Sequence, residues 1–266
     1  FDVTAEDIYA ELKDKYGISV VVEKIDTAIA DKEITDDKEA KEYAENQIKA
    51  LKAQYKQYNM DFNEALVNAG YENEDALKSA IIENYKKDLV LTNYIKDTLT
   101  DDEINKYYKD EIYGEMTVKH ILIKPVVEDT MTDEEKKTAE NEALEKADDA
   151  GTASLGGLCA NFTKKGVVPE FFEASLELKD GEYTKEPVKT TYGYHIILKV
   201  SQNEKPKLDD VIDDIKETLA TEKLSDDETL SITAWDGIRK KYNITFNDSA
   251  IKESYDKVID SYKTQN

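Results

Sequence analysis

This chain contains few side chains of the types that usually carry out chemistry. Its 266 residues include two histidines, His120 and His195, and one cysteine, Cys159. A single cysteine excludes an intrachain disulfide. Residues 1–114 contain no glycine-rich phosphate loop, no pair of metal-binding residues and no nucleophile motif. The two histidines are therefore the first side chains whose positions have to be understood.

Acidic clusters recur along the chain and could be mistaken for calcium ligands. Three of them follow a hydroxyl residue, at Thr100–Glu103, Thr132–Glu135 and Ser225–Glu228, and Thr4–Asp7 is a weaker version. They lack the alternating spacing and the glycine of a calcium loop. A hydroxyl with a glutamate three residues later is typical of the start of a helix. We therefore expect helix caps at these positions and no metal site.

The overall charge excludes several classes of partner. The net charge is -23, and 36% of the residues are charged. Such an acidic surface repels phosphate backbones, so we expect neither a nucleic-acid partner nor direct adsorption onto anionic lipid. No apolar run approaches the ~20 residues that span a bilayer. The apolar residues recur periodically, which favours a folded protein of one or two domains.

Both histidines lie in stretches that alternate between apolar and polar residues. The pattern predicts strands at residues 117–124 and 192–200. Between them we expect a helix, a turn at Gly156 and Gly157, and a short helix over residues 170–178. If the two strands pair antiparallel, the ends of this segment lie about 4.8 Å apart, the spacing of neighbouring strands.

The two flanks of this segment have helical periodicity. Helices are expected at 4–15, 19–30, 37–59, 74–99 and 101–110, and again, with interruptions, from Leu208 to about Tyr262. The sequence thus predicts an α+β fold. A small antiparallel-sheet domain, residues 115–204, is inserted into an all-helical domain made of residues 1–114 and 205–266.

Five motifs in register resemble the parvulin-type peptidyl-prolyl isomerases. They are Val118-Lys-His-Ile-Leu-Ile123, Gly151-Thr-Ala-Ser-Leu-Gly-Gly157, Val168-Pro-Glu-Phe171, Leu178-Lys-Asp-Gly-Glu182 and Pro187-Val-Lys-Thr-Thr-Tyr-Gly-Tyr-His-Ile-Ile197. The flanking helices and the position of the insert resemble the PrsA-type foldases of Gram-positive bacteria, within the wider SurA/PrsA group. The resemblance implies cis/trans isomerase activity without a cofactor or a metal.

The resemblance also implies a catalytic group. His120 and His195 fall on the two histidines of the family, on neighbouring strands, where they form a hydrogen-bonded group with Thr190 beneath the active site. Asp149 falls on or near the acidic or thiol position that precedes the Gly-Gly loop. Two roles stay open for the histidines, since they could act directly on the substrate or cross-link two strands.

Three further residues are expected around the substrate. Phe171 falls on the aromatic residue that lines the proline pocket, although it could also serve only core packing. Val167 falls where the family has Met or Leu as a second wall, and Phe162 completes the predicted substrate-binding set.

The chain also departs from the family pattern. Cys159 replaces a core leucine, so we expect a buried, inert side chain, and Asn161 stands where an aromatic is common. Asp148 runs almost directly into Gly151, where the family has a longer helical segment. Either the domain is shortened there or a segment is missing from the sequence. A true deletion would uncover one face of the sheet.

We therefore expect an isomerase and foldase that acts on unfolded or partly folded exported polypeptides. The alternative is a non-catalytic chaperone with a degenerate parvulin domain, for which the 17 tyrosines offer adaptable contact surface. A purely structural surface protein is a third hypothesis.

We expect an extracytoplasmic lipoprotein, held at the membrane only by a lipid upstream of Phe1. Homodimerisation is left open. The loop after Ile123 begins with Lys124 and has no cluster of Lys and Arg residues to bind a phosphate. We therefore expect little demand for a phosphorylated residue in the substrate.

Overall fold

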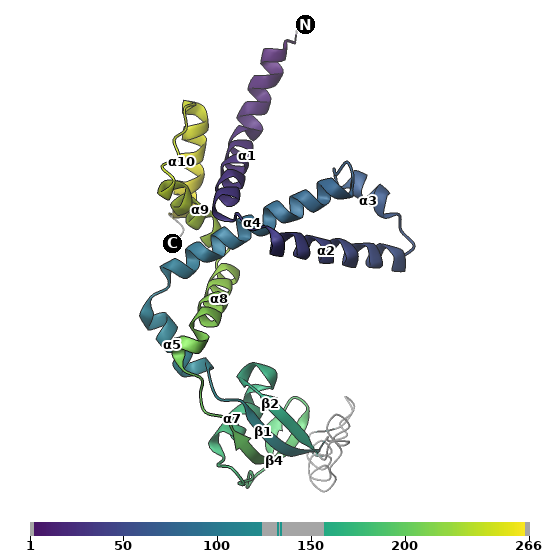
Figure 1. Ribbon diagram of the computed structural model, residues 1–266, viewed down its shortest axis with the longest axis vertical. Coiled ribbons are helices and arrows are strands. Elements are labelled where there is room, and N and C mark those ends of the chain that lie inside the picture. The colour runs from purple at the N-terminus through teal and green to yellow at the C-terminus, as the bar shows by residue number, and fades with distance from the viewer. Residues whose placement is uncertain (1–2, 124–131, 133, 135–156, 264–266) are drawn as a thin grey trace. The chain divides into compact units, whose positions relative to one another are not determined.

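The chain folds into two compact units, which Figure 1 shows in a computed structural model that describes residues 3–123, 132, 134 and 157–263. Residues 1–100 and 216–266 form a helical unit, and residues 101–215 form a second unit with one sheet. The predicted α+β class is confirmed. The predicted insert, residues 115–204, lies wholly inside the second unit, which also contains α5 (Asp101–Glu111).

Hydrogen bonds explain why α5 belongs with the sheet. The Lys205 ammonium donates to the carbonyl oxygen of Tyr108 at 2.6 Å, and the Tyr108 hydroxyl donates to the carbonyl oxygen of Pro206 at 2.7 Å. The Lys164 ammonium reaches Glu111 at 2.7 Å. These bonds hold α5 against two segments that each follow a strand, so the compact unit begins earlier than the strand pattern.

The helical unit is built from α1 (Ala5–Glu33), α2 (Lys38–Gln57), α3 (Phe62–Asn68), α4 (Glu74–Thr98), α9 (Leu230–Lys241), α10 (Ser249–Lys263) and the later part of α8 (Leu208–Asp226). The prediction of separate helices at 4–15 and 19–30 is wrong, because α1 continues through Gly17. An interior glycine costs a helix only about 1 kcal/mol, and packing against α10 offsets that cost. α3 was not predicted.

The predicted helix caps have different outcomes. Thr4 and Asp7 form the capping box at the start of α1, and Thr100 directly precedes α5. The Ser225 cap is wrong, because α8 continues to Asp226 and α9 begins only at Leu230. The cap after Thr132 falls largely outside the described residues.

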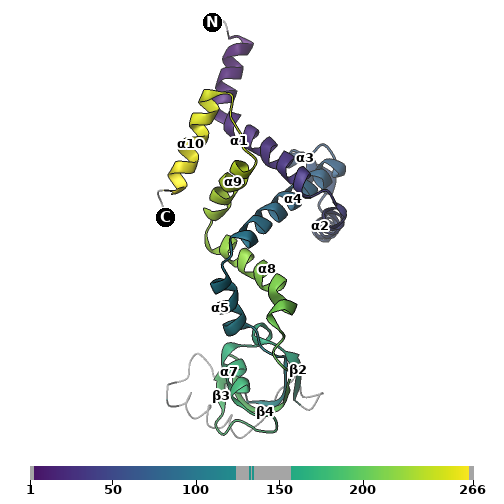
Figure 2. The ribbon, with the colours of Figure 1, turned by 60° about the vertical axis from the view of Figure 1, so that its left-hand side comes forward.

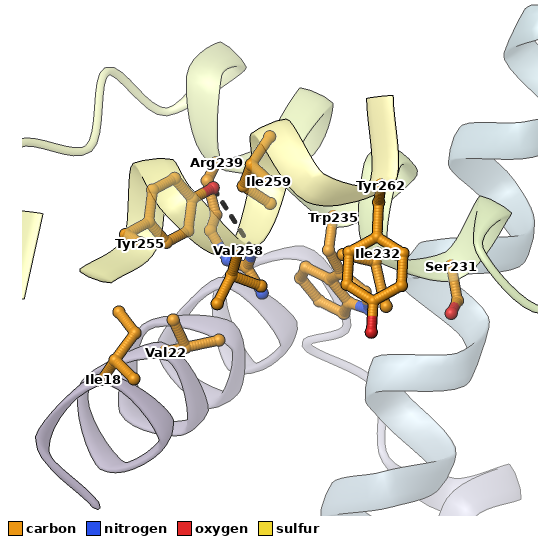
Figure 3. A pocket seen from close by; sticks show the side chains of 10 residues that line it. All are labelled: Ile18, Val22, Ser231, Ile232, Trp235, Arg239, Tyr255, Val258, Ile259 and Tyr262. Carbon is orange, nitrogen blue, oxygen red and sulfur yellow. Dashed lines mark hydrogen bonds between the residues drawn. The ribbon is translucent and has the colours of Figure 1, made fainter. Parts of the chain in front are cut away.

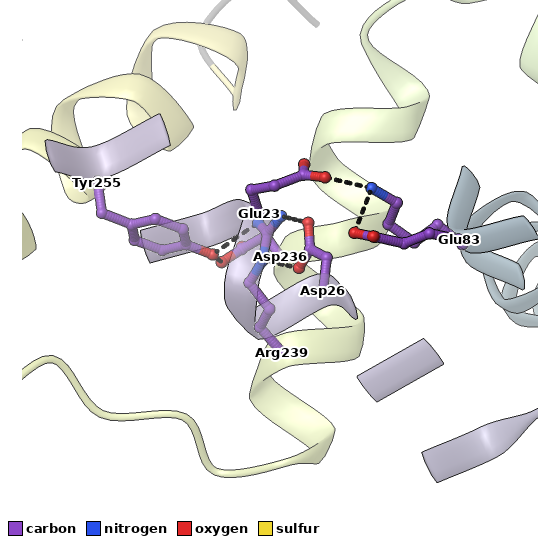
Figure 4. Close-up of polar contacts among 7 residues, drawn as sticks. Glu23, Asp26, Glu83, Asp236, Arg239 and Tyr255 are labelled. Carbon is purple, nitrogen blue, oxygen red and sulfur yellow. Dashed lines mark hydrogen bonds and ion pairs between the residues drawn. The ribbon is translucent and has the colours of Figure 1, made fainter. Parts of the chain in front are cut away.

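The core of the helical unit is formed by helices from both the first and the last part of the chain. Its apolar centre contains side chains from α1, α4, α8 and α9: Ile29, Ala30, Val90, Leu91, Ile95, Ala220, Ala234 and Ile238. Beside it lies a buried polar network (Figure 4). Arg239 donates two hydrogen bonds to Asp26, at 2.7 and 2.5 Å, and the Tyr255 hydroxyl donates to Asp236 at 2.9 Å. Lys240 and Lys263 bind the same Asp236 carboxylate.

The second unit holds a four-stranded sheet in the order β2-β1-β4-β3, with every neighbouring pair antiparallel. The strands are β1 (Met116–Ile123), β2 (Leu158–Phe162), β3 (Val188–Thr190) and β4 (Gly193–Gln202). The helix α7 (Pro169–Glu177) packs on the sheet (Figures 1 and 2). The core between them contains Met116, Val118, Phe162, Phe171, Phe172 and Ile197.

The predicted antiparallel pairing of the two histidine-bearing strands is confirmed. Met116 at the start of β1 pairs with Gln202 at the end of β4, and the Asn203 amide donates to the Glu115 carbonyl at 2.9 Å. A Cβ atom on Gly114 would overlap the Asn203 carbonyl, so only glycine fits this close approach. The chain therefore enters and leaves the sheet at neighbouring points.

Asn161 has a backbone reason for its departure from the family pattern. Its φ is 52°, in the left-handed region that asparagine tolerates better than aromatic residues. The register between β1 and β2 shifts here, with Met116 opposite Phe162 and Val118 opposite Cys159. Asn161 thus lies in a β-bulge at the edge of the sheet.

Candidate active site

His120 and His195 lie side by side on the same face of the sheet. His120 pairs with Ile197 and His195 with Leu122, so the two histidines are diagonal neighbours on β1 and β4. Their Nδ1 atoms are 3.1 Å apart. His195 is buried and His120 is half-buried. The predicted contact between the two rings is therefore present.

Thr190 extends the pair into a chain of hydrogen bonds. Its Oγ1 lies 2.9 Å from His195 Nε2, accepts from the Tyr192 amide at 3.1 Å and donates to the Gly193 carbonyl at 3.3 Å. With the Thr190 proton directed to Gly193, His195 Nε2–H donates to Thr190. His195 Nδ1 then accepts from His120 Nδ1–H, which leaves the lone pair of His120 on Nε2. The contact between the two Nδ1 atoms excludes one state, in which both of these atoms carry a proton and N–H faces N–H.

Phe171 closes the histidine pair from the side of α7. Its ring centroid lies 5.2 Å from that of His120 and 5.1 Å from that of His195, with the planes at 82° and 76°. Such edge-to-face contacts fix the orientation of all three rings. Pro169 at the start of α7 sets this position, because its ring favours the first turn of a helix.

A pocket of about 320 Å³ opens over these rings. It is lined by His120, Cys159, Lys165, Gly166, Val167, Val168, Phe171, Tyr192 and His195. Its size matches the lower end of small-molecule sites. The part of the chain that the structure describes contains no group of three or more His, Cys, Asp or Glu residues placed to hold a metal ion.

The structure brings most of the predicted site residues together. His120, His195, Val167 and Phe171 line the pocket, while Thr190 lies behind His195. Phe162 is buried behind Phe171, with ring centroids 5.8 Å apart, and is not among the lining residues. Asp149 lies outside the described residues.

Sequence reasoning missed part of the pocket lining. Cys159 was predicted to be buried, but it is half-buried and lines the pocket, because β2 is an edge strand. Tyr192 lines the pocket and is exposed. It lies three residues before His195 in the last of the five parvulin-like motifs, and this closeness in sequence could have indicated its place at the site. Lys165 lies between two predicted substrate-binding residues, Phe162 and Val167, which could have drawn attention to it.

The fold and the site together define a class of protein. A hydrogen-bonded histidine pair on adjacent strands, under a pocket with Phe171 and Val167 among its walls in a small α+β domain, is the arrangement expected of a rotamase. Residues 122–201 match the model of the PPIC-type PPIase domain, and the match begins two residues after His120. The chain is a peptidyl-prolyl isomerase.

The similarity extends over nearly the whole chain. It is 32% identical over 231 residues to Foldase protein PrsA 3 of Bacillus anthracis, covering 85% of this chain and 75% of that protein. It is 29% identical over 266 residues to Foldase protein PrsA of Bacillus subtilis, covering 96% and 82%. The crystal structure of foldase protein PrsA from Streptococcus pneumoniae, 20% identical, shares the fold with a TM-score of 0.62 over 95% of both chains. The chain belongs to the PrsA foldase family.

Proposed function

We propose that the pocket over the histidine pair isomerises Xaa-Pro bonds without a covalent step. Planar amides resist rotation by ~18–20 kcal/mol because resonance stabilises the planar form. The twisted form is less polar, so a pocket with apolar walls stabilises it more than the planar form. The observation that supports this most is the placement of Phe171 and Val167 beside the two histidine rings in one open pocket.

The residues around the pocket then have distinct roles. Phe171 and Val167 contact the proline ring, and Phe162 supports Phe171 from behind. The His120–His195–Thr190 chain holds the two central strands and the Phe171 ring in register. Asp149, as the acidic residue before the Gly-Gly loop, stays a prediction.

Tyr192 allows a matched test of this site. Tyr192 lines the pocket, whereas Tyr183 is similarly exposed in the same unit and does not line it. We expect Tyr192→Ala to lower kcat/KM for an Ala-Pro peptide and Tyr183→Ala to leave it near the wild-type value, measured by NMR exchange spectroscopy. Equal effects of the two substitutions would contradict the proposed site, as would acceleration confined to phosphorylated Ser-Pro peptides.

The helical unit supports a second function, the binding of unfolded clients. A second pocket, of about 260 Å³, opens between α1, α9 and α10, and Trp235, Tyr262, Ile18 and Val22 are among its walls (Figure 3). The first half of α1 and Val3, just before it, also expose a series of large apolar and aromatic side chains. They are Val3, Ile8, Tyr9, Leu12, Tyr16 and Val20. Exposed apolar surface of this kind is typical of an interaction site.

Client binding is tested by suppression of aggregation. We expect Tyr9→Ser with Leu12→Ser to weaken the protection of an unfolded client in light scattering. The control is Tyr58→Ser with Met60→Ser, which changes a similar exposed pair near the end of α2. Equal protection by both variants would contradict a binding role for α1.

We further propose that the clients are exported polypeptides and that the protein works outside the cytoplasmic membrane on a lipid anchor. Membership of the PrsA family supports this location. No helix among the described residues is long and apolar enough to cross a membrane. A single acyl chain binds only marginally, so two or more are required. Recovery of the full-length protein in the cytoplasmic fraction of its host would contradict the proposal. Homodimerisation stays a prediction, which sedimentation would test.

A further inference from the structure

The pocket between α1, α9 and α10 has the size of a site for one side chain. Its volume is about 260 Å³, whereas pockets for drug-sized ligands have roughly 300–1,000 Å³. Branched aliphatic side chains form much of its lining: Ile18, Val22, Ile232, Val258 and Ile259. The volume and these walls suit one large apolar side chain better than a small-molecule ligand.

The lining of this pocket also contains aromatic rings and a cation. Trp235, Tyr255 and Tyr262 line it together with Arg239 (Figure 3). The guanidinium carbon of Arg239 lies 5.6 Å from the ring centroid of Trp235 and 5.6 Å from that of Tyr255. Both distances are within the range of a cation–π contact, so Arg239 already packs against rings at this site.

Hydrogen bonds hold the guanidinium group of Arg239 in place. Its Nε and Nη2 atoms donate to the Asp26 carboxylate at 2.7 and 2.5 Å, and its Nη1 atom donates to the Tyr255 hydroxyl at 3.4 Å. Arg239 is only 6% exposed. A guanidinium group that hydrogen-bonds in its plane can still stack on its faces, and a desolvated cation attracts a ring more strongly than an exposed one.

We propose that this pocket binds one aromatic side chain of an unfolded client. The negative π face of a client ring is complementary to the Arg239 cation, and its edges pack against Trp235 and Tyr262. An aliphatic side chain of the same size fills the same space but lacks the π face. This inference rests on the proposed client-binding function of the helical unit, and it names the type of residue that the unit selects.

The exposed apolar residues of α1 lie within reach of a client held in this way. Ile18 lines the pocket, and Leu12, six residues earlier on the same helix, is exposed. Six residues of a helix span about 9 Å, which an extended chain covers in about three residues. A client anchored by one ring can therefore also contact the first half of α1.

Trp235 reports directly on the occupant of the pocket, because it is the only tryptophan in the chain and one of the lining residues. The probes are three Gly/Ser peptides without tryptophan or proline that differ at one central residue, which is Phe, cyclohexylalanine or Ala. We expect the Phe peptide to change Trp235 fluorescence saturably, with a Kd about two- to fivefold below that of cyclohexylalanine, the size of a cation–π contact. Equal Kd values for these two peptides would overturn the selection of aromatic residues.

Two exposed valines of the helical unit give a matched pair of variants. Val258 lines the pocket, whereas Val67 lies on α3 and is not among the lining residues. We expect Val258→Phe to abolish the response to the Phe peptide by filling the pocket and Val258→Leu to weaken it, while Val67→Phe keeps the wild-type Kd. Circular dichroism verifies that each variant folds. Equal effects of Val258→Phe and Val67→Phe, or an unchanged Kd in both Val258 variants, would contradict binding in this pocket.

Other occupants would give other results, and each of them would overturn the proposal. Tighter binding of decanoic acid than of the Phe peptide would identify a site for acyl chains. A Trp235 spectrum that changes with protein concentration in the absence of peptide would identify a second copy of the chain. Light scattering separates the two proposals: a wild-type protein that protects an unfolded client without preferring Phe over cyclohexylalanine contradicts the aromatic anchor alone, whereas one that protects no client contradicts both.

Discussion

The two units bury polar groups in different ways. In the helical unit, Arg239 forms a bidentate ion pair with Asp26, a residue 213 positions away in the chain. In the sheet unit, buried polar groups have neutral partners: His195 has Thr190 and His120, and Lys199 has Gln202 and a backbone carbonyl. The first arrangement joins distant segments of the chain. The second adjoins an open pocket.

The two arrangements serve different purposes, since the ion pair belongs to the fold of the helical unit and the hydrogen-bonded histidines belong to the isomerase site. A buried ion pair is costly to break but adds little to stability over a well-packed apolar pair, so we expect the Asp26–Arg239 pair to specify which helices meet. The hydrogen bonds from His120 through His195 to Thr190 have a geometric task, because they fix the rings beside the isomerase pocket. The predictions below test this contrast, beginning with the largest expected effect.

Removal of one partner of the ion pair should have the largest effect. Burial raises the pKa of Asp26, although Arg239 lowers it, which shows how costly this charge is without its partner. We expect Asp26→Ala to lower the free energy of unfolding of the helical unit by about 3–5 kcal/mol, because Arg239 is left buried and unpaired. Urea unfolding followed by fluorescence of Trp235, the only tryptophan in the chain, measures this unit.

The double variant Asp26→Leu with Arg239→Met is the control. It removes both charges and should recover most of the loss. A double variant as unstable as Asp26→Ala would show that the pair itself, and not the unpaired charge, determines the stability.

Loss of the Thr190 hydroxyl should have the next largest effect. Thr190→Val keeps the shape but leaves the buried His195 Nε2–H without an acceptor, which costs about 1–3 kcal/mol. We expect lower stability and lower kcat/KM together, with a changed tautomer in the ¹⁵N spectrum of the histidine side chains. Thr190→Ser should restore both, and Thr191→Val, at the exposed neighbouring position, should change neither. Unchanged histidine spectra in Thr190→Val would exclude the proposed positioning role.

Lys199 gives a smaller, pH-dependent effect. It is buried at 3% exposure, and burial lowers the pKa of Lys199 below its usual 10.5. The unfolded chain therefore holds this proton at pH values where the folded chain has lost it, so the contribution of Lys199 to stability rises with pH through that window. We expect Lys199→Met to be about 1 kcal/mol more stable than wild type at neutral pH.

This advantage of Lys199→Met should shrink as the pH approaches 10.5, the usual pKa of lysine. Thermal unfolding of both proteins across the alkaline range measures the difference and cancels the other titrating groups. A difference that is constant with pH would show that the ammonium in the folded protein is solvated.

Sequence reasoning recovered what depends on local pattern and on recognisable motifs. The strands that carry His120 and His195 follow from alternation, and the position of Phe171 at the pocket follows from the resemblance. What it missed depends on tertiary contacts. Cys159 looks like a core residue, but its strand is at an edge. The Asp26–Arg239 pair joins residues whose separation leaves no local signal.

Gly17 is the clearest case of a local rule that tertiary structure overrides. The sequence pattern predicted a break there, yet α1 continues. A Cβ atom at residue 17 would lie 3.3 Å from the Lys13 side chain and 3.6 Å from Ile251 on α10, so a methyl group fits after a small shift of Lys13. At Gly237, on α9, a Cβ atom would overlap the Tyr94 ring.

The two glycines therefore give the last and smallest prediction. We expect Gly17→Ala to stabilise the helical unit by about 0.5–1 kcal/mol, because alanine loses less backbone entropy in a helix. Gly237→Ala should destabilise the same unit by about 1–3 kcal/mol, because Tyr94 must move from a packed position. Trp235 fluorescence during urea unfolding measures both, while kcat/KM for an Ala-Pro peptide should stay unchanged. If Gly17→Ala were destabilising, Lys13 would be unable to make the small shift that the added methyl group requires, and the contact would outweigh the gain in backbone entropy.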